Sequence, residues 1–135
     1  MTNETTLGMI KPDAVKKKVV GKIISMIEES GIEIEKMKTE RLTKEKAQKF
    51  YQVHKDKPFY EPLTEFMSSG PIVVMKLSGE NVVSRYRKLM GATDFAKAEA
   101  GTIRKLFATS IQENAVHGSD SPENAKIEIE FFYSL

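Results

Sequence analysis

Residues 72–75 read IVVM, a run that is apolar at every position and rich in β-branched side chains. A half-exposed strand alternates apolar and polar residues, whereas a continuous apolar run is typical of a strand with two buried faces. The run comes directly after SSGP at residues 68–71, where a preceding helix is expected to end. We therefore predict that residues 72–75 form a central strand of a sheet.

The first thirty residues predict one strand and one helix. Residues 6–10 are compatible with a strand that ends at Lys11, because Pro12 lacks a backbone donor and restricts the residue before it. Apolar residues recur at helical spacing over residues 19–27 and predict an amphipathic helix, with Gly31 as its C-cap.

Between that helix and the central strand, we predict one further strand and two helices. Apolar and acidic residues alternate from residue 32, and Met37 breaks the alternation, which indicates a bulge or a change of face. Thr43 is a good N-cap for a helix that would run to a break at Pro58. A short helix is predicted over residues 62–67.

The chain after the central strand predicts two more helices and a short strand. Residues 82–90 have helical spacing and are closed by Gly91. Residues 91–113 are weakly patterned, and so long a connection in a compact domain is usually functional. Residues 115–116 are compatible with a short last strand.

The final segment can be interpreted in two ways. IEIEF at residues 127–131 alternates as a strand would, whereas SPE at residues 121–123 is a strong helix start. Ala125, Ile129 and Phe132 would share one face of a helix. We predict a helix.

This order of elements predicts an α+β fold of the ferredoxin-like, split βαβ type. Such a fold has a four-stranded antiparallel sheet with helices on it. Here it would also carry an inserted helical hairpin and a long loop. Many functions occur on this fold, so the fold alone indicates none of them.

Composition limits the classes of function. The chain has 135 residues, which fits one domain spanning residues 1–135. It carries 21 Lys and Arg against 19 Asp and Glu, a net charge of +2 that disfavours bulk binding of nucleic acid or membrane. The absence of cysteine excludes disulfides, thiolate metal sites and cysteine nucleophiles.

No targeting segment is recognisable either. The N-terminal MTNETTLGMIK lacks the basic start and long apolar stretch of a secretory signal. No window approaches the ~18 consecutive apolar residues that a membrane span needs. We therefore expect a soluble, cytoplasmic protein.

Several catalytic motifs are absent from the sequence, among them GxxxxGK[ST], GxGxxG, HExxH and GxSxG. No Asp and His cluster has metal-ligand spacing, so a metal would arrive on a substrate, as nucleotides carry Mg²⁺. The remaining candidate for chemistry is NAVHGSDS at residues 114–121, where a histidine ends a short strand ahead of a helix.

The histidine of this stretch, His117, has two interpretations. Taken alone, it is most often a structural histidine in a turn. In favour of a functional one, Gly118 permits close backbone approach, and a neutral imidazole is a competent nucleophile. Ser119, Asp120 or Glu128 could each hold the imidazole in one tautomer.

Two further features could belong to a site. Lys11, Arg87 and Arg104 are each most simply solvated surface charges, and they would act together only if the fold gathers them. In KPFY at residues 57–60, two aromatic rings lie beside a proline. They could form a corner of the core or an exposed ring on which a base stacks.

Five blocks of sequence resemble the nucleoside diphosphate kinase family: KPDAV at residues 11–15, KPFY at 57–60, SGP at 69–71, GTIR at 101–104 and NAVHGSDS at 114–121. The match runs in order from about residue 6 to about residue 132, and NxxHGSDS is the most diagnostic block. The resemblance implies transfer of the γ-phosphoryl of a nucleoside triphosphate, mainly ATP, to a nucleoside diphosphate. It also implies a ping-pong mechanism through a phosphohistidine, with little base specificity.

The resemblance further implies roles for individual residues. His117 would be the nucleophile, Glu128 and Ser119 would fix its tautomer, and Tyr51 would help to position it. Lys11 would contact the sugar and the transferring phosphate. The remaining nucleotide-binding residues would be Arg87, Thr93 and Arg104 on the phosphates, Asn114 on the ribose, and Phe59, Leu63 and Ile111 around the base.

By the same resemblance, Mg²⁺ would be bound by the nucleotide phosphates and not by protein ligands, and the protein would be a homo-oligomer, either a tetramer or a hexamer. The sequence departs from the family at Asp94-Phe95, where Asn-Pro is frequent, in a loop that supports subunit contacts.

Two other functions fit the sequence less well. A ferredoxin-like module that binds RNA would carry aromatic residues on its central strands, and residues 72–75 are aliphatic. A regulatory protein that has lost activity would show a damaged motif, and here every catalytic position of the family is filled.

Overall fold

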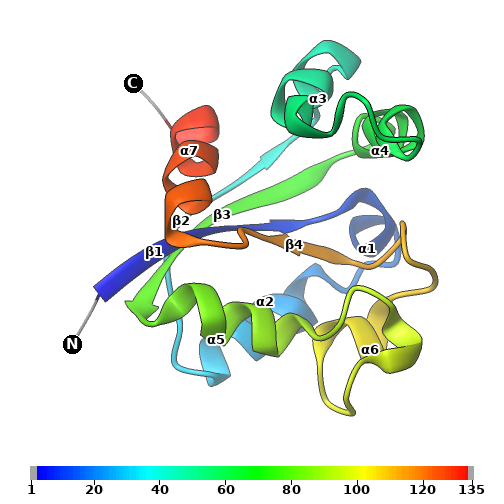
Figure 1. The fold of residues 1–135 in the computed structure, drawn as a ribbon. Coiled ribbons are helices and arrows are strands. Elements are labelled where there is room, and N and C mark those ends of the chain that lie inside the picture. The colour runs from blue at the N-terminus through cyan, green and yellow to red at the C-terminus, as the bar shows by residue number, and fades with distance from the viewer. Residues whose placement is uncertain (1–2, 134–135) are drawn as a thin grey trace.

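The computed structural model describes residues 3–133 and contains a four-stranded antiparallel sheet with helices on both faces (Figure 1). Its strands, in the order β2-β3-β1-β4, are β1 (Asn3–Ile10), β2 (Glu33–Glu40), β3 (Ile72–Glu80) and β4 (Val116–Gly118). The predicted fold class is confirmed, and residues 72–75 lie at the start of the central strand β3, where all four are buried.

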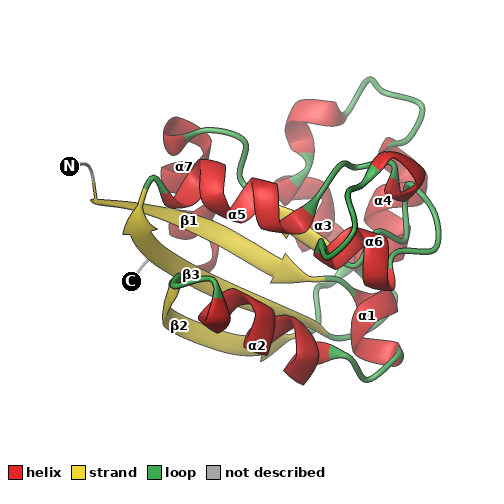
Figure 2. Cartoon of the chain, turned by 90° about the horizontal axis from the view of Figure 1, so that it is seen from below, coloured by secondary structure: helices red, strands yellow, loops and turns green. Residues whose placement is uncertain are grey.

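Helices cover the two faces of this sheet (Figures 1 and 2). On one face lie α2 (Val20–Glu29) and α5 (Val82–Met90), and on the other lie α3 (Lys44–Phe50), α4 (Tyr60–Met67) and α7 (Pro122–Tyr133). Short helices α1 (Pro12–Lys16) and α6 (Ile103–Phe107) and 3₁₀ turns at Gln52–His54 and Phe95–Lys97 complete the described chain. No helix in residues 3–133 is long and apolar enough to span a bilayer.

Strand alternation divides the buried side chains into two cores. In β1, Leu7 and Met9 pack with α3, α4 and α7, whereas Ile10 packs with α2 and α5. In β3, Val74 belongs to the first of these cores and Met75 to the second. Because successive side chains of a strand point to opposite faces, the same rule decides which way each residue of β4 points.

Most of the predicted elements are confirmed, although some of their ends differ from the predicted ones by up to five residues. The Thr43 hydroxyl accepts a hydrogen bond from the Lys46 amide and caps α3, and Ser121 does the same for α7 through the amide of Asn124. The final segment is therefore the helix predicted from SPE, and IEIEF is not a strand. The cap fixes the start of this helix locally. The apolar and acidic residues that alternate at 127–131 are exposed or half-buried residues of the helix.

One prediction about local structure was wrong, and one helix was not predicted. The helix that begins after Thr43 ends at Phe50, well before Pro58, and a 3₁₀ turn follows it. The bulge predicted in β2 is confirmed, because the register with β3 shifts between Ile34 and Lys36, just before Met37. Helix α1 was not predicted, although a proline is favoured in the first turn of a helix.

Candidate active site

The position of His117 follows from the alternation of β4. The strand pairs with β1, so that His117 lies opposite Met9. Gly118 faces the core under α5, where an added Cβ would lie 2.8 Å from the Tyr86 ring. His117 must therefore point to the opposite face of the sheet, toward α3 and α7.

There the His117 imidazole meets a carboxylate of α7. Its Nε2 lies 2.8 Å from Oε1 of Glu128, and the Ser119 hydroxyl donates a hydrogen bond to the same oxygen, also at 2.8 Å. Ser119 is buried, and its amide donates to the Leu7 carbonyl at 3.2 Å. A carboxylate against Nε2 favours the tautomer with the proton on that nitrogen, which leaves the lone pair on Nδ1.

An aromatic ring that the sequence did not single out lies against this imidazole. The Phe50 ring, at the end of α3, makes an edge-to-face contact with His117 with centroids 5.7 Å apart. Tyr51, the predicted partner, packs edge-to-face on Phe50 at 4.9 Å. Burial, together with the charge of Glu128, raises the pKa of Tyr51, so its hydroxyl stays protonated and lies near the carboxylate.

The predicted base-binding residues come together around one cavity of about 320 Å³. Phe59 and Leu63 come from the α4 region, and Ile111 comes from the long segment before β4. Phe59 and Ile111 are 47% and 61% exposed, so two large apolar side chains stand open to solvent at this cavity. The residues that line the cavity are Lys11, Phe59, Leu63, Thr93, Ile111 and Gln112.

Two cations are buried near this cavity. Lys11 is 7% exposed, and burial, followed by the charge of Arg104, lowers its pKa to about 8, against an opposing effect of Asp13. Burial likewise lowers the pKa of Arg104. Because an anion placed beside them would favour both charged forms, this region of the protein is prepared for a negatively charged ligand.

Arg104 also braces the backbone that leads to His117. Its guanidinium donates hydrogen bonds to the carbonyls of Gly91 (3.1 Å), Asn114 (3.4 Å) and Val116 (2.9 Å). The Asn114 side chain is tied through Nδ2 to the Ile111 carbonyl at 2.8 Å. Its Oδ1 is buried with no hydrogen-bond partner among the described residues, so it is an acceptor without a donor.

Arg87 is not among the residues that line the cavity around Phe59. It is exposed and lines a neighbouring hollow of about 400 Å³ with Gly91, Lys97 and Thr102. Its charge nevertheless affects the site, because it helps to lower the pKa of Arg104. Arg87 is therefore an exposed cation at the edge of the site, and the predicted cationic group is only partly assembled.

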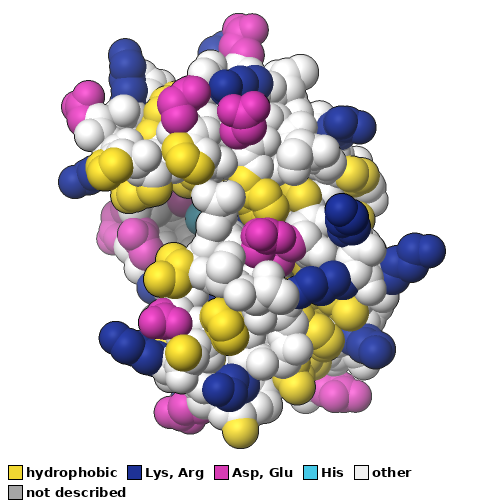
Figure 3. Space-filling model, turned by 90° about the vertical axis from the view of Figure 1, so that its right-hand side faces the viewer, with side chains coloured by type: hydrophobic (Ala, Val, Ile, Leu, Met, Phe, Trp, Pro, Cys, Tyr) yellow, Lys and Arg dark blue, Asp and Glu magenta, His cyan; other side chains and the backbone are white. Residues whose placement is uncertain are grey.

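On the side of the molecule that Figure 3 shows, charged side chains of one sign do not gather in a large patch. Basic and acidic side chains are interspersed there with hydrophobic ones. Within residues 3–133 no three His, Cys, Asp or Glu side chains are grouped as metal ligands. The described residues thus offer buried cations and a histidine, the groups that suit phosphate chemistry.

The profile of the family described as Nucleoside diphosphate kinase matches residues 4–135. The chain is 58% identical to a nucleoside diphosphate kinase of Persephonella marina over 99% of this chain and 96% of that protein. A Campylobacter jejuni relative with the same description is 60% identical over 96% of this chain and 95% of its own.

Solved structures agree with these relatives. The nucleoside diphosphate kinase of Aquifex aeolicus superposes with a TM-score of 0.96 at 44% identity, covering 98% of this chain and 96% of that one. A halophilic nucleoside diphosphate kinase from Halobacterium salinarum, solved in complex with CDP, gives 0.94 at 35% identity, covering 99% and 90%.

Proposed function

The chain belongs to the nucleoside diphosphate kinase family, and we propose that His117 carries the phosphoryl group in its reaction. The chain is an enzyme that transfers a phosphoryl group from a nucleoside triphosphate to a nucleoside diphosphate. The observation that carries the assignment is the 2.8 Å contact between Nε2 of His117 and Glu128, which leaves Nδ1 as the nucleophilic atom.

The reaction then has two half-steps at one site. The Nδ1 lone pair attacks the γ-phosphorus, and the bond from phosphorus to the bridging oxygen breaks as the nucleoside diphosphate leaves. After exchange of nucleotides, an oxygen of the acceptor's terminal phosphate attacks the same phosphorus, and the bond to Nδ1 breaks. Glu128 keeps the proton on Nε2 and stabilises the positive charge that develops on the ring.

Charge neutralisation is the main requirement for this transfer, because negative charge is spread over the equatorial oxygens of the phosphoryl group. Lys11 and Arg104 would supply positive charge from within the site, with Arg87 at its edge and the Thr93 hydroxyl as a donor. Mg²⁺ would enter on the phosphates of the substrate and supply further charge there. The lowered pKa of Lys11 supports this role, because phosphate would restore its fully charged form.

The nucleoside would lie in the cavity beside Phe59. Stacking on an aromatic face contributes about 1–3 kcal/mol and accepts any base. Leu63 and Ile111 add apolar walls without a hydrogen-bond code, which supports low base specificity. The orphaned Oδ1 of Asn114 is a suitable acceptor for a ribose hydroxyl.

We also propose a compartment and an assembly state for the enzyme. We expect a cytoplasmic homo-oligomer, either a tetramer or a hexamer. In the loop where the family often has Asn-Pro, Asp94 accepts a hydrogen bond from the Ala96 amide at 3.1 Å and caps a 3₁₀ turn. This cap supports an ordered loop without the proline.

The test is to incubate the protein with γ-labelled ATP in the absence of an acceptor. We expect covalent label that is lost in acid, survives base and transfers to any added nucleoside diphosphate, because a phosphorus–nitrogen bond to histidine has this stability. His54→Ala is the matched control, since His54 is the other histidine and lies on a 3₁₀ turn. Label that persists in His117→Ala would exclude the proposed intermediate.

A further inference from the structure

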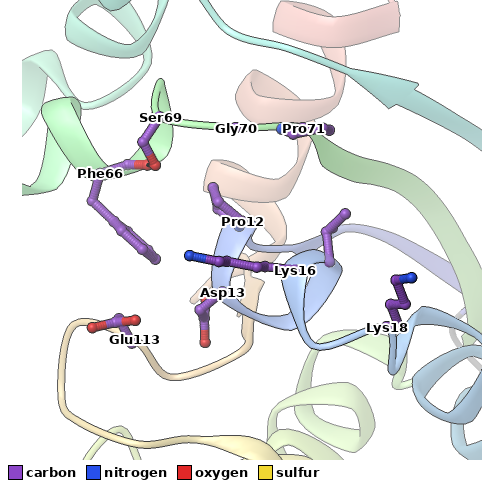
Figure 4. A pocket seen from close by; sticks show the side chains of 10 residues that line it. Pro12, Asp13, Lys16, Lys18, Phe66, Ser69, Gly70, Pro71 and Glu113 are labelled. Atoms are coloured by element: carbon purple, nitrogen blue, oxygen red, sulfur yellow. Dashed lines mark hydrogen bonds between the residues drawn. The ribbon is translucent and has the colours of Figure 1, made fainter.

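Asp13 is a buried carboxylate to which the reaction described above gives no role. It lies in the first turn of α1 and is 6% exposed. Figure 4 shows its side chain pointing from α1 toward the loop that carries Glu113 and leads into residue 114. Its Oδ2 accepts a hydrogen bond from the Ala115 amide at 3.1 Å.

The residue that it binds has an unusual backbone. Ala115 has φ of +74°, and the Val116 amide donates to the Asn114 carbonyl at 2.9 Å across it. A hydrogen bond between residues two apart, closed over a central residue with this φ, belongs to the rare and strained form of the γ-turn. Strain of this kind persists only where the surroundings impose it.

Those surroundings are the residues of the phosphate site. The Ala115 carbonyl accepts a hydrogen bond from the Lys11 amide at 2.8 Å, and the Ala115 amide donates one to Asp13. The Arg104 guanidinium binds the carbonyls on either side, those of Asn114 and Val116. The γ-turn is thus held through both backbone groups of Ala115 and through the carbonyls of Asn114 and Val116.

The turn connects residues whose relative positions matter for the reaction. Asn114 is its first residue, His117 follows it directly, and the Lys11 amide is hydrogen-bonded to the Ala115 carbonyl at its centre. A displacement of the turn would change the position of His117 relative to Lys11 without removing either side chain. In phosphoryl transfer a misplacement of ~1 Å can reduce the rate by about 10²-fold.

We propose that Asp13 is a positioning residue, which holds the strained turn at residues 114–116 and thereby sets His117 against the phosphate-binding Lys11. The proposal rests on the assignment of His117 as the phosphoryl carrier. Asp13 is not among the residues that line the cavity at Phe59, and it acts through the hydrogen bond to the Ala115 amide. The carboxylate also faces Lys11 and Lys17, whose charges oppose the rise in its pKa that burial causes.

Two variants separate the hydrogen bond from the charge. Asp13→Asn keeps an acceptor for the Ala115 amide and removes the charge, whereas Asp13→Ala removes both. Ile27→Val, a buried change in α2 remote from the turn, serves as a control for a general loss of stability. Each variant is measured at pH 7 by the rate of His117 phosphorylation in a single turnover, with two donors, MgATP and phosphoramidate.

We expect Asp13→Ala to lose about 10²-fold in rate with MgATP, whose nucleoside and phosphates must meet Lys11 and His117 together. With phosphoramidate, a small donor that can reorient, the rate should stay at the wild-type value. Asp13→Asn and Ile27→Val should keep the wild-type rate with both donors. Hydrogen exchange of the Ala115 amide should accelerate in Asp13→Ala alone.

Three results would overturn the proposal: an unchanged MgATP rate in Asp13→Ala, an equal loss with both donors, or an Asp13→Asn variant as slow as Asp13→Ala. An equal loss would indicate a smaller folded fraction, and a slow Asn variant would assign the effect to charge. Failure of the phosphohistidine mechanism itself is distinguishable, because MgATP would then leave no phosphoryl group on His117 of the wild-type protein.

Discussion

At the scale of single residues, the carboxylate of Glu128 serves two partners at once. It accepts from His117 Nε2 and from the Ser119 hydroxyl, both at 2.8 Å, so one oxygen fixes the tautomer and is itself held in place. A hydrogen bond to an ionised group contributes about 1.5–3 kcal/mol, more than one between neutral groups. The orientation of the imidazole therefore depends on α7 as much as on β4.

The change Glu128→Ala tests this dependence. We expect phosphorylation of His117 by MgATP to slow by about 10²-fold, because a side chain positioned for proton transfer usually contributes at least this factor to the rate. Nucleotide affinity should stay nearly intact. Glu130→Ala, which removes an exposed carboxylate from the same helix, is the control and should change neither quantity. Equal losses of affinity and rate in Glu128→Ala would show that the residue supports the fold instead.

A second residue-scale prediction concerns Lys11 and pH. Its folded pKa of about 8 lies below the ordinary value of 10.5, so between these values the unfolded chain binds more protons than the folded one. Stability should therefore rise from pH 8 to pH 10.5 through this group, since unfolding takes up a proton there. Below pH 8 the cost of burying the charge is fully present.

Lys11→Met removes that cost. We expect the variant to be inactive yet more stable by about 1–3 kcal/mol at pH 7, since each unit of pKa shift corresponds to ~1.4 kcal/mol. The advantage should shrink toward pH 10.5, as followed by urea unfolding at several pH values. Lys16→Met, a change at an exposed lysine of α1, is the comparison. A variant less stable than the wild type at pH 7 would contradict the burial argument.

At the scale of elements, strand β4 is held by contact with helix α5. Gly118 has its backbone against Tyr86 and Met90, and an added Cβ would approach them to 2.8 and 2.9 Å. A glycine is needed here for space, because its neighbour His117 must be presented on the other face. Local sequence indicated close approach at Gly118 but could not name Tyr86, which lies 32 residues earlier in the chain.

Gly118→Ala should therefore destabilise the protein by about 1–3 kcal/mol, the usual effect of overpacking a core. The matched control is Gly21→Ala in α2, where a Cβ would meet nothing within 4 Å. That change should stabilise by about 0.5–1 kcal/mol through helix propensity. Thermal unfolding of both variants checks the pair, and similar effects of the two would refute the packing explanation.

Helices with local start signals could be predicted from the sequence, whereas features set by long-range contact could not. The caps at Thr43 and Ser121 lie within three residues of the groups they bind. The broken alternation at Met37 indicated a bulge in β2, but its place in the register with β3 could not be predicted, and the contact of Phe50 with His117 joins residues 67 apart in the chain. Such features need the assembled sheet, because sequence periodicity describes only one element at a time.

At the scale of the whole molecule, the site is a meeting of distant segments. The resemblance to the kinase family named His117, Glu128 and Ser119, which the structure brings into one hydrogen-bonded group. It also named Phe59, Leu63 and Ile111 as residues around the base, and these residues line one cavity. It gave no role to Asp13, although KPDAV contains this residue, and sequence could not reveal that its partner is a backbone amide 102 residues away.

The net charge of +2 conceals this local organisation. Lys11 and Arg104 are buried together beside the turn that carries His117, and each has its pKa lowered, first by burial. The fold thus stores unfavourable electrostatic energy where we propose that a phosphate binds, and a bound nucleotide should stabilise the protein. The central claim that connects these parts is that Glu128 keeps the proton on Nε2 and leaves Nδ1 to attack.

The most direct measurement is the site of phosphorylation on the ring. The protein, labelled with ¹⁵N in its histidines, is phosphorylated with MgATP, and phosphorus–nitrogen couplings are read by NMR under basic conditions. The structure predicts a single phosphohistidine, bonded through Nδ1 of His117, with the proton retained on Nε2. Phosphorus bonded to Nε2 of His117, or to His54, would contradict the account.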